Sequence, residues 1–477
     1  MSKHVFIKTF GCQMNERDSE IMEQLLSQAG YISVAEQEDA DLVILNTCSI
    51  RAKAEQKVFS LLGLLRKQKD KQPDLRIAVA GCVAQQEGKQ IFKRMPHVDI
   101  VVGTQQIYQL PDMLLRLDRD ETKREISCDL EKSFTIPPFQ KLLTGDNKRL
   151  PSPVTPEFRK FVTIMQGCNN FCSYCVVPAT RGREISRPVD DILEEVALQV
   201  DKGVKEITLL GQNVNSYGCT NAVADQQTSF ADLLKMVAGV PGVERLRFTS
   251  SNPQDLSTEL MQCFAELDNL CPHFHLPVQS GSNAVLKRMH RKYTRELYLE
   301  KIDTLRSFCP EIAISTDMIV GFPGETDQDF EQTMDLLETV RFHGSFSFKY
   351  SDRPNTRSAD FDDKVDEQIK GERLQRFQKR QDQISLERNK GLLGKTVEVM
   401  VENVVDTTIQ ARTGTNHIVH FESSESFAPG DSAQVTIIHA GKHSLNGERK
   451  GHCFSRRDVA PTTFLQSRSG VSPRIKL

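Results

Sequence analysis

Three cysteines crowd into the short segment from Gly167 to Cys175, and this segment restricts the fold more than any other part of the chain. Three residues separate the first two cysteines, and two residues separate the second from the third. The preceding residues, Arg159 to Gln166, are mixed in polarity and rich in β-branched side chains, which predicts a strand. The cysteines therefore lie on a loop that leaves the carboxyl end of a strand. A loop this short can aim three sulfurs at one point.

Three thiolates at this spacing are typical of an iron–sulfur cluster, whose irons are held by cysteine. A 4Fe–4S cube ligated by Cys168, Cys172 and Cys175 keeps one iron open to a small molecule, as a catalytic zinc keeps one position free. The alternatives are structural zinc and buried free cysteine. Structural zinc usually takes a second ligand pair at matching spacing, and none follows nearby.

The spacing CxxxCxxC, with the aromatic Tyr174 before the last cysteine, resembles the signature of the radical S-adenosylmethionine (SAM) enzymes. The resemblance implies that the open iron chelates the amino and carboxylate groups of SAM. It also implies that electron transfer at this site cleaves SAM into methionine and a 5′-deoxyadenosyl radical.

Length and composition set outer limits on the function. A chain of 477 residues predicts several domains, and it has no apolar run of about eighteen residues that would predict a membrane span. The N-terminus is strand-like at once and lacks the hydrophobic region of a signal peptide, so we expect a cytoplasmic protein. Twelve cysteines in such a chain indicate metal or redox chemistry rather than disulfides. The net charge of −3 does not predict nucleic-acid binding, so any RNA-binding surface must be local.

In the first part of the chain, three strand-like segments each end in a cysteine. These cysteines are Cys12, Cys48 and Cys82, and helical patterns lie between them. Alternating strands and helices predict a doubly wound parallel α/β sheet, in which ligands bind beyond the carboxyl ends of the strands. The three cysteines can therefore converge on a second cluster. The alternative is three independent core cysteines.

The motifs around these cysteines resemble those of the methylthiotransferases, a branch of the radical SAM enzymes. The motifs are Gly11-Cys-Gln-Met-Asn-Glu16, Asn46-Thr-Cys-Ser-Ile-Arg51 and Gly81-Cys-Val-Ala-Gln85. They are most similar to the MiaB-type enzymes that act on tRNA, and the resemblance covers nearly the whole chain. It implies an auxiliary 4Fe–4S cluster on Cys12, Cys48 and Cys82.

The pattern along the rest of the chain predicts three further regions. Strands and helices alternate after the cysteine loop and give six βα-like units, which predicts a partial TIM-like (β/α)6 barrel with its active site at the carboxyl ends of the strands. Short strands separated by turns follow, which predicts a small antiparallel β-barrel that resembles the RNA-binding TRAM domain. The predicted divisions are an N-terminal domain at 1–120, a linker at 121–153, a radical SAM core at 154–386, a TRAM-like barrel at 387–454 and a basic tail at 455–477.

Several predicted strand ends resemble the loops that hold SAM in this class of enzyme. One carries Gln212 and Asn213, where the class places polar groups against the methionine part of SAM. Another carries Asp317, Gly321 and Glu325, which resemble the segment against its adenine. Taken alone, such glycine-rich loops are usually only turns.

Basic and aromatic residues near these regions are candidates for RNA contact. Arg181, Arg183 and Arg187 closely follow the cysteine loop, where an RNA phosphate needs neutralising. In the predicted barrel, His417 and Phe421 are candidates for contact with a base. The alternative for each arginine is a solvated loop.

Together these resemblances imply a radical SAM methylthiotransferase that adds a 2-methylthio group to N6-isopentenyladenosine beside the anticodon of tRNA. One SAM donates the methyl group to a sulfur on the auxiliary cluster, and a second SAM yields the radical. Activation of an aromatic C–H bond suits radical chemistry because the bond has no useful acidity, and the protein supplies positioning. Such a reaction needs a tRNA anticodon stem-loop, a sulfur donor and an electron donor such as flavodoxin or ferredoxin, and we expect a monomer.

Two other functions agree with parts of the sequence. A methylthiotransferase could instead act on threonylcarbamoyl-adenosine in tRNA or on a ribosomal protein, although the residues after Cys12 and Cys48 favour the isopentenyl branch. A non-catalytic iron–sulfur RNA-binding protein, for example a redox sensor, would need clusters and RNA affinity but would not cleave SAM. An assay for 5′-deoxyadenosine separates the enzyme from the sensor.

Overall fold

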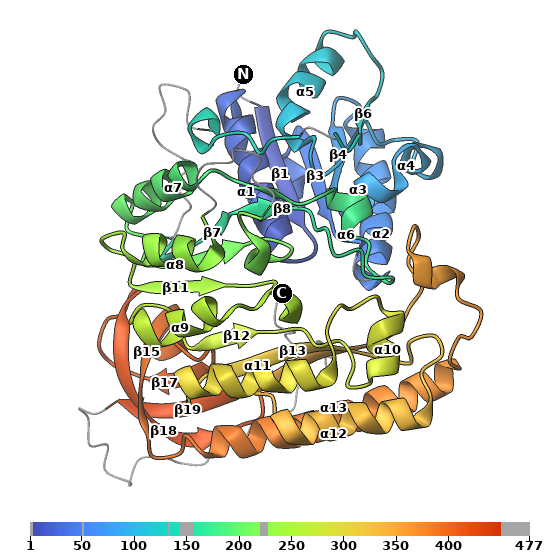
Figure 1. Ribbon diagram of the computed structural model, residues 1–477. Coiled ribbons are helices and arrows are strands. Elements are labelled where there is room, and N and C mark those ends of the chain that lie inside the picture. The colour runs from blue at the N-terminus through green and yellow to red at the C-terminus, as the bar shows by residue number, and fades with distance from the viewer. Residues whose placement is uncertain (1–2, 50–51, 132–133, 143–156, 220–227, 450–477) are drawn as a thin grey trace, which may run out of the picture. The chain divides into compact units, whose positions relative to one another are not determined.

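The computed structural model describes residues 3–49, 52–131, 134–142, 157–219 and 228–449 (Figure 1). They form two compact units, Met1–Ser385 and Leu386–Leu477. The first unit contains two regions built on parallel strands, and the second unit is a β-barrel. No helix in the described ranges has both the length and the apolar character needed to span a bilayer.

The first region is a six-stranded sheet with the order β2-β1-β3-β4-β5-β6, and all its pairings are parallel. Its strands are β1 (Lys3–Thr9), β2 (Tyr31–Ser33), β3 (Leu42–Thr47), β4 (Arg76–Gly81), β5 (Ile100–Val102) and β6 (Glu125–Ser127). One face is covered by helices α1 (Gln13–Gln28) and α5 (Leu110–Asp118). The other face is covered by α2 (Ala52–Lys71), α3 (Cys82–Glu87) and α4 (Lys89–Arg94). The predicted doubly wound α/β fold is confirmed.

Strand β3 shows why the sheet is covered on both faces. All of its residues are buried, with Leu42 and Ile44 in the core of one face and Val43 and Leu45 in the core of the other. A strand buried on both sides reads as a continuous apolar run rather than an alternating one. The helices on the two faces therefore fix β3 in the middle of the sheet and direct its carboxyl end toward Cys48.

The predicted boundary at residue 120 is wrong in one respect. Strand β6 lies inside the range predicted as a linker, yet it pairs with β5 and forms the edge of the sheet. Three residues with one buried member give too short a pattern to predict a strand. The predicted linker residues 143–156 lie outside the described residues.

The second region contains six parallel strands in chain order. They form two sheets, β11-β10-β7 and β12-β13-β14, that are joined by a parallel bridge between Leu246 and Leu270. The strands are β7 (Arg159–Thr163), β10 (Glu206–Leu210), β11 (Arg245–Phe248), β12 (His273–His275), β13 (Ala313–Val320) and β14 (Gly344–Lys349), and a separate ribbon pairs β8 (Met165–Gln166) with β9 (Ile185–Ser186). The helices are α6 (Val177–Arg181), α7 (Val189–Asp201), α8 (Phe230–Ala238), α9 (Thr258–Glu266), α10 (Asn283–Arg288), α11 (Arg295–Phe308) and α12 (Asp327–Val340). The predicted partial (β/α)6 barrel is confirmed.

Helix α13 (Glu367–Lys390) packs alongside α12 (Figure 1). Arg376 pairs with Glu331 and Arg380 pairs with Glu338 along the two helices. These exposed pairs contribute little, roughly 0–1 kcal/mol each, whereas Phe377 of α13 is fully buried in the core of the barrel region. The charged stretch predicted as a connector is therefore also part of the first unit.

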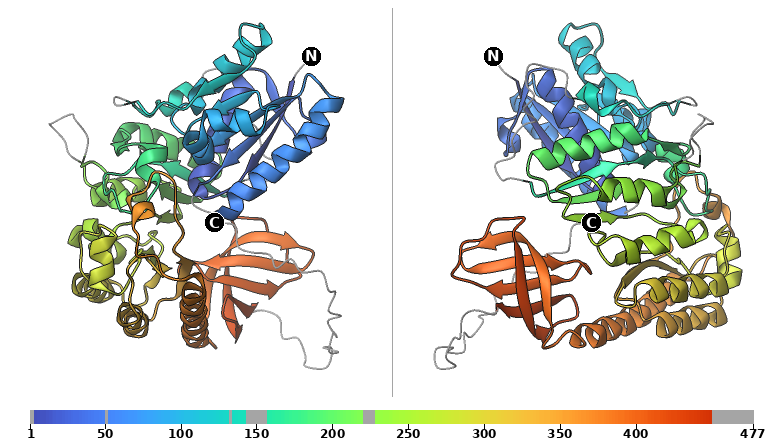
Figure 2. Two further views of the ribbon diagram at one scale, coloured as in Figure 1. Left: turned by 90° about the vertical axis from the view of Figure 1, so that its right-hand side faces the viewer. Right: turned by 60° about the vertical axis from the view of Figure 1, so that its left-hand side comes forward.

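The second unit is a closed five-stranded barrel with the order β15-β16-β17-β19-β18, and β18 pairs back to β15 (Figure 2). Its strands are β15 (Thr396–Val405), β16 (Thr408–Thr413), β17 (Ile418–Glu422), β18 (Ser432–Ala440) and β19 (Ser444–Arg449). The predicted small barrel is confirmed, with two differences. Strand β19 was not predicted from the sequence, and it pairs with β17 in parallel rather than antiparallel.

Candidate active site

The three clustered cysteines lie on a loop that follows the β7–β8 segment. The loop is held by backbone bonds from Cys168 N–H to Gly182 O (3.2 Å) and from Ser173 N–H to Met289 O (3.0 Å). At Gly167, which has a φ of +81°, a Cβ would stand 2.0 Å from Arg183 O. Only glycine allows the strand end to pass this close to the returning chain. Backbone contacts therefore fix the loop at its start and at Ser173, between the second and third cysteines.

The thiols of this loop suit a cluster better than a single ion. Cys168, Cys172 and Cys175 are free, partly buried and close enough to affect one another's charge. Among the described residues, however, no three Cys, His, Asp or Glu side chains converge tightly enough to hold one metal ion. In a cluster each cysteine binds a different iron, so the three sulfurs need not meet at one metal atom. Burial, then the neighbouring Cys172, raises the pKa of Cys175 to about 12, so metal binding must displace its proton.

A half-buried cation, which the sequence did not reveal, contacts this loop. Arg291 Nη1 donates to Cys172 Sγ at 3.3 Å, and the same side chain donates to Tyr293 Oη (2.8 Å) and Pro277 O (3.1 Å). The pKa of Arg291 is raised well above its ordinary value although burial opposes its charge, because Tyr293, Tyr174 and Cys172 lie close by. Arg291 therefore places a fixed positive charge against one of the predicted cluster ligands.

Polar side chains with free hydrogen-bonding capacity surround the loop at the strand ends. Gln212 accepts a bond from Gly167 N–H, and Asn213 Nδ2 donates to Asp255 Oδ2 at 2.7 Å. Within the described ranges, six buried atoms of this neighbourhood have no hydrogen-bond partner: Gln166 Nε2, Glu184 Oε1, Gln212 Nε2, Asn213 Oδ1, Asn215 Oδ1 and Ser251 Oγ. Unsatisfied buried polar groups are rare in folded proteins, and here they fit a polar ligand. The two SAM-loop candidates Gln212 and Asn213 thus lie where a ligand can use them.

Glu184 is a member of this group that sequence reasoning missed. Its carboxyl group is buried, and burial raises its pKa to about 7. Its backbone N–H donates to Asn169 Oδ1 (3.3 Å), between the first two cysteines of the loop. Glu184 therefore belongs to the wall of the same site.

The second predicted SAM loop is arranged differently. Asp317 lies on β13 and its carboxylate is 3.5 Å from His275 Nε2. The Glu325 carboxylate accepts from Gly321 N–H (2.8 Å) and from Arg373 Nη1 (2.7 Å). The bond between Gly321 and Glu325 thus fixes the shape of the loop. The Asp317 carboxylate instead lies on strand β13 of the barrel, close to His275.

The other three cysteines lie at the carboxyl edge of the N-terminal sheet. Cys12 is the N-cap of α1, Cys48 follows β3, and Cys82 is the first residue of α3. A Cβ at Gly11 would stand 2.5 Å from Cys48 Cβ, so the first two motifs are in close contact. A hydrogen bond between Cys12 and Cys48 lowers the pKa of Cys12 to about 6, while burial raises the pKa of Cys82. The sheet therefore brings Cys12 and Cys48 into contact and places Cys82 close enough to Cys12 to affect its charge.

The residues beside these cysteines tie the three motifs together. Asn15 Nδ2 donates to Thr47 O (2.9 Å), Asn46 Nδ2 donates to Asn15 O (2.7 Å), and Thr47 Oγ1 donates to Ala80 O (2.6 Å). All three side chains are fully buried. The network explains why asparagine and threonine accompany the cysteines, because it fixes the spacing of three strand ends.

Helix α6 joins the two cysteine triads. It begins directly after the loop triad and packs on α3 of the N-terminal region. Its last residue, Arg181, is buried and pairs with Asp18 of α1 at 2.6 Å. Arg187 is also buried, and pairs with Asp191 (2.6 Å) and Glu195 (2.7 Å). The prediction that Arg181 and Arg187 contact RNA phosphate is therefore wrong.

Two exposed side chains do remain available beside the loop triad. Phe171 is 39% exposed, and the guanidinium of Arg183 lies 5.0 Å from the centre of its ring. Arg183 thus stays a candidate for RNA contact. In the barrel, Phe421 is buried in the core and cannot stack on a base, so that prediction is wrong, and His417 is only partly exposed.

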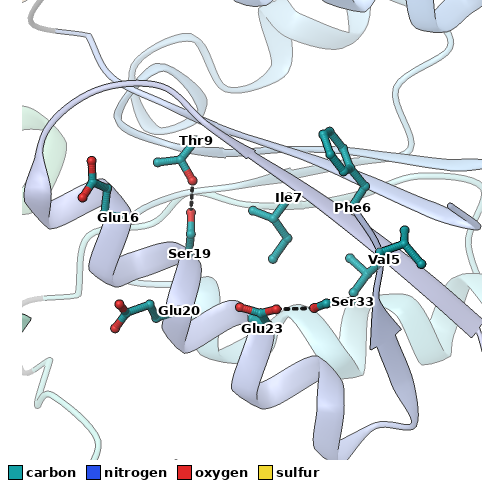
Figure 3. Close-up of a pocket in the computed structure, with 10 residues that line it drawn as sticks. Val5, Phe6, Ile7, Thr9, Glu16, Ser19, Glu20, Glu23 and Ser33 are labelled. Carbon is teal, nitrogen blue, oxygen red and sulfur yellow. Dashed lines mark hydrogen bonds between the residues drawn. The ribbon is translucent and has the colours of Figure 1, made fainter. Parts of the chain in front are cut away.

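A cavity of about 300 Å³ opens between β1 and α1 (Figure 3). Its lining includes Glu16, Glu20 and Glu23 of α1, and Glu23 accepts a hydrogen bond from Ser33. Glu20 pairs with Arg17 at 2.9 Å. None of the six cysteines lines this cavity, so it is separate from the site described above.

Comparison with known proteins matches both regions of the first unit. Residues 4–103 match a family described as uncharacterized protein family UPF0004, and residues 162–337 match the radical SAM superfamily. A tRNA-2-methylthio-N(6)-dimethylallyladenosine synthase from Desulfotalea psychrophila is 59% identical over 445 residues, which are 93% of this chain and 98% of that protein. Proteins of the same name from Syntrophus aciditrophicus and Geobacter sulfurreducens are 46% and 47% identical; they align with 94% of this chain and with 94% and 97% of their own lengths.

Solved structures are similar in fold at much lower identity. The radical SAM methyltransferase TsrM from Kitasatospora setae, solved with cobalamin and a 4Fe-4S cluster bound, has a TM-score of 0.53 and 12% identity, covering 75% of this chain and 74% of its own. The cobalamin-dependent SAM radical enzyme OxsB has a TM-score of 0.51 and 13% identity, covering 76% and 55%. At this identity the likeness supports the fold alone.

Proposed function

This chain belongs to the radical SAM family of tRNA-2-methylthio-N(6)-dimethylallyladenosine synthases, and we propose that its two cysteine triads divide the work of that reaction. It is a tRNA methylthiotransferase that converts N6-isopentenyladenosine to its 2-methylthio derivative. Its cofactors are 4Fe–4S clusters and SAM. The observation that carries the division of work is the presence of two separate triads joined by one short helix.

We assign Cys168, Cys172 and Cys175 to the radical SAM cluster and Cys12, Cys48 and Cys82 to the auxiliary cluster. Each set offers three cysteine thiols, the number that leaves one iron open to SAM or to a sulfur ligand. When bound, these groups supply the one-electron cleavage of SAM and the sulfur that is methylated and transferred. The chain supplies the rest, which is position, charge and exclusion of water.

The polar wall beside the loop triad fits the methionine and ribose parts of SAM. Gln212 and Asn213 present free amide atoms there, and we propose that both bind SAM. Asp317 is proposed to bind a polar group of the nucleoside from the barrel side. Gly321 and Glu325 are proposed to act by holding the loop in shape, because the Glu325 carboxylate already has two partners.

The substrate adenine is proposed to lie between the triads. Arg181 lies six positions after Cys175, most of them in α6, and this spans about 9 Å at the helical rise. A separation of that order suits a flipped-out base whose reacting carbon faces both sites. Base flipping is how enzymes reach an atom inside a structured nucleic acid.

The remaining assignments follow from the chemistry. We propose that the substrate is the anticodon stem-loop of tRNA, that the second unit acts as the TRAM-like RNA-binding module, and that Arg183 with Phe171 contacts the RNA near the active site. The reaction also requires a sulfur donor and a one-electron donor such as flavodoxin or ferredoxin. We propose a monomer in the cytoplasm.

A reconstitution assay tests the function. The protein, loaded with iron and sulfide, is incubated with SAM, a reductant and an anticodon stem-loop that carries N6-isopentenyladenosine, and the nucleosides are analysed by mass. The expected product is 2-methylthio-N6-isopentenyladenosine together with 5′-deoxyadenosine. The matched stem-loop with unmodified adenosine is expected to give much less product. Abundant 5′-deoxyadenosine without any methylthio nucleoside would contradict the proposal.

A further inference from the structure

Arg181 has unused hydrogen-bonding capacity in an unusual place. It is 3% exposed and lies at the contact between the two α/β regions of the first unit. Its Nη2 donates to Asp18 Oδ2 (2.6 Å) and to Asn15 Oδ1 (3.3 Å), but Nη1 has no hydrogen-bond partner among the described residues. A buried guanidinium with a free N–H group is costly unless a ligand uses it.

The surroundings of Arg181 identify what such a ligand can be. The guanidinium interacts with the thiol of Cys82 and is close enough to Cys12 to affect its charge. Among the described residues, Asp18 supplies the carboxylate that pairs with this positive charge. The side chain therefore faces the auxiliary triad with one N–H group free, which fits a small anion bound at that triad.

We propose that Arg181 binds the sulfur anion held at the auxiliary triad, a hydrosulfide or an alkanethiolate, and fixes its position for transfer. The inference rests on the proposed function, which requires a sulfur at this triad. A charge-assisted hydrogen bond in a buried site favours an anionic sulfur over a neutral thiol. Because Arg181 ends the helix that begins just after the radical SAM triad, the same residue ties the position of the sulfur to that of the other site.

Arg17 provides a matched control. It is also a buried arginine at the contact between the two α/β regions, but its partners are Glu20 (2.9 Å) and Glu195. Arg17→Lys therefore disturbs the interface without changing a group that faces the cysteines. Any effect that is specific to the sulfur site should be absent from it.

The experiment measures binding of sodium methanethiolate to the full-length chain. Cys168, Cys172 and Cys175 are changed to alanine, so that the auxiliary cluster is the one that remains. Perturbation of its electron paramagnetic resonance spectrum gives a Kd, and iron content is measured in every variant. The double variant Arg181→Met with Asp18→Asn removes the ion pair as a unit and is expected to raise the Kd about ten- to hundredfold. Arg17→Lys is expected to leave it unchanged.

The single variant Asp18→Asn is expected to change the Kd for methanethiolate in the opposite direction, by lowering it. It keeps the guanidinium but removes the carboxylate that neutralises it, so thiolate binding is expected to tighten. An unchanged Kd in the iron-loaded double variant would overturn the proposal. If that variant fails to take up iron, the absence of tightening in Asp18→Asn overturns it instead. These outcomes are independent of product formation, so a failure of the methylthiotransferase assay is recognised separately.

Discussion

Replacement of Arg291 by glutamine should lower the reduction potential of the radical SAM cluster. Arg291 donates to Cys172 Sγ at 3.3 Å and carries a half-buried positive charge. Reduction adds one electron, so the cation stabilises the reduced cluster more than the oxidised one. A hydrogen bond to a charged group is worth about 1.5–3 kcal/mol. If about 1.4 kcal/mol of this is specific to the reduced state, the potential falls by about 60 mV for one electron.

A redox titration of the full-length chain with Cys12, Cys48 and Cys82 changed to alanine gives this potential for one cluster alone. Tyr293→Phe is the matched control, because it removes the 2.8 Å partner of Arg291 but keeps the cation, and a smaller shift is expected. Iron content must be equal in the variants that are compared. A fully loaded Arg291→Gln variant with the parent potential, or a higher one, would refute the reasoning.

Three further predictions concern stability and RNA binding. Glu195 is fully buried and pairs with both Arg17 and Arg187. Glu195→Gln should therefore lower the free energy of unfolding by about 3–5 kcal/mol in denaturant titrations. As a control, Glu331→Gln at the exposed pair with Arg376 should lower it by less than about 1 kcal/mol. Truncation after Ser385 should preserve iron content and SAM cleavage but weaken tRNA binding, and equal tRNA affinity at every salt concentration would show that the barrel is not the RNA-binding module. Burial lowers the pKa of His417 to about 4, so this histidine binds a proton more readily in the unfolded barrel than in the folded one. The barrel should therefore lose stability as the pH falls from about 6.5 to about 4. Thermal unfolding of His417→Gln should show a flatter pH dependence over this range.

The sequence predicts most elements of this fold because their patterns are local. Helix α8 begins and ends where its apolar period indicates, and a capping box between Ser229 and Asp232 marks its start. The strands that precede Cys48 and Cys82 are largely apolar, and the one before Cys12 is mixed but rich in strand-forming residues. Their shared edge follows from the rules of parallel sheets. The short strand β6 and the final strand β19 lacked such signals.

The interactions between regions could not be predicted in the same way. Arg181 and Arg187 stand in a polar loop sequence, and charged residues are mostly exposed, so solvent or RNA was the natural expectation. Their partners Asp18 and Glu195 lie on other elements, and only the folded chain brings them together. Arg291 was missed for the same reason, since its contact with Cys172 spans 119 positions of sequence. The cysteines themselves were recognisable because their spacing and their place after strands are local properties.

The separability of the two triads tests the account most directly. Cys168→Ala and Cys48→Ala are prepared in the full-length chain, loaded with iron and sulfide, and assayed for 5′-deoxyadenosine and for the methylthio nucleoside in the same reaction. Cys168→Ala should form neither, because the site of SAM cleavage is lost. Cys48→Ala should still form 5′-deoxyadenosine but no methylthio nucleoside, because only the sulfur-carrying site is damaged. Full methylthiolation by Cys48→Ala would contradict the account, as would loss of SAM cleavage in a Cys48→Ala variant whose loop cluster is intact.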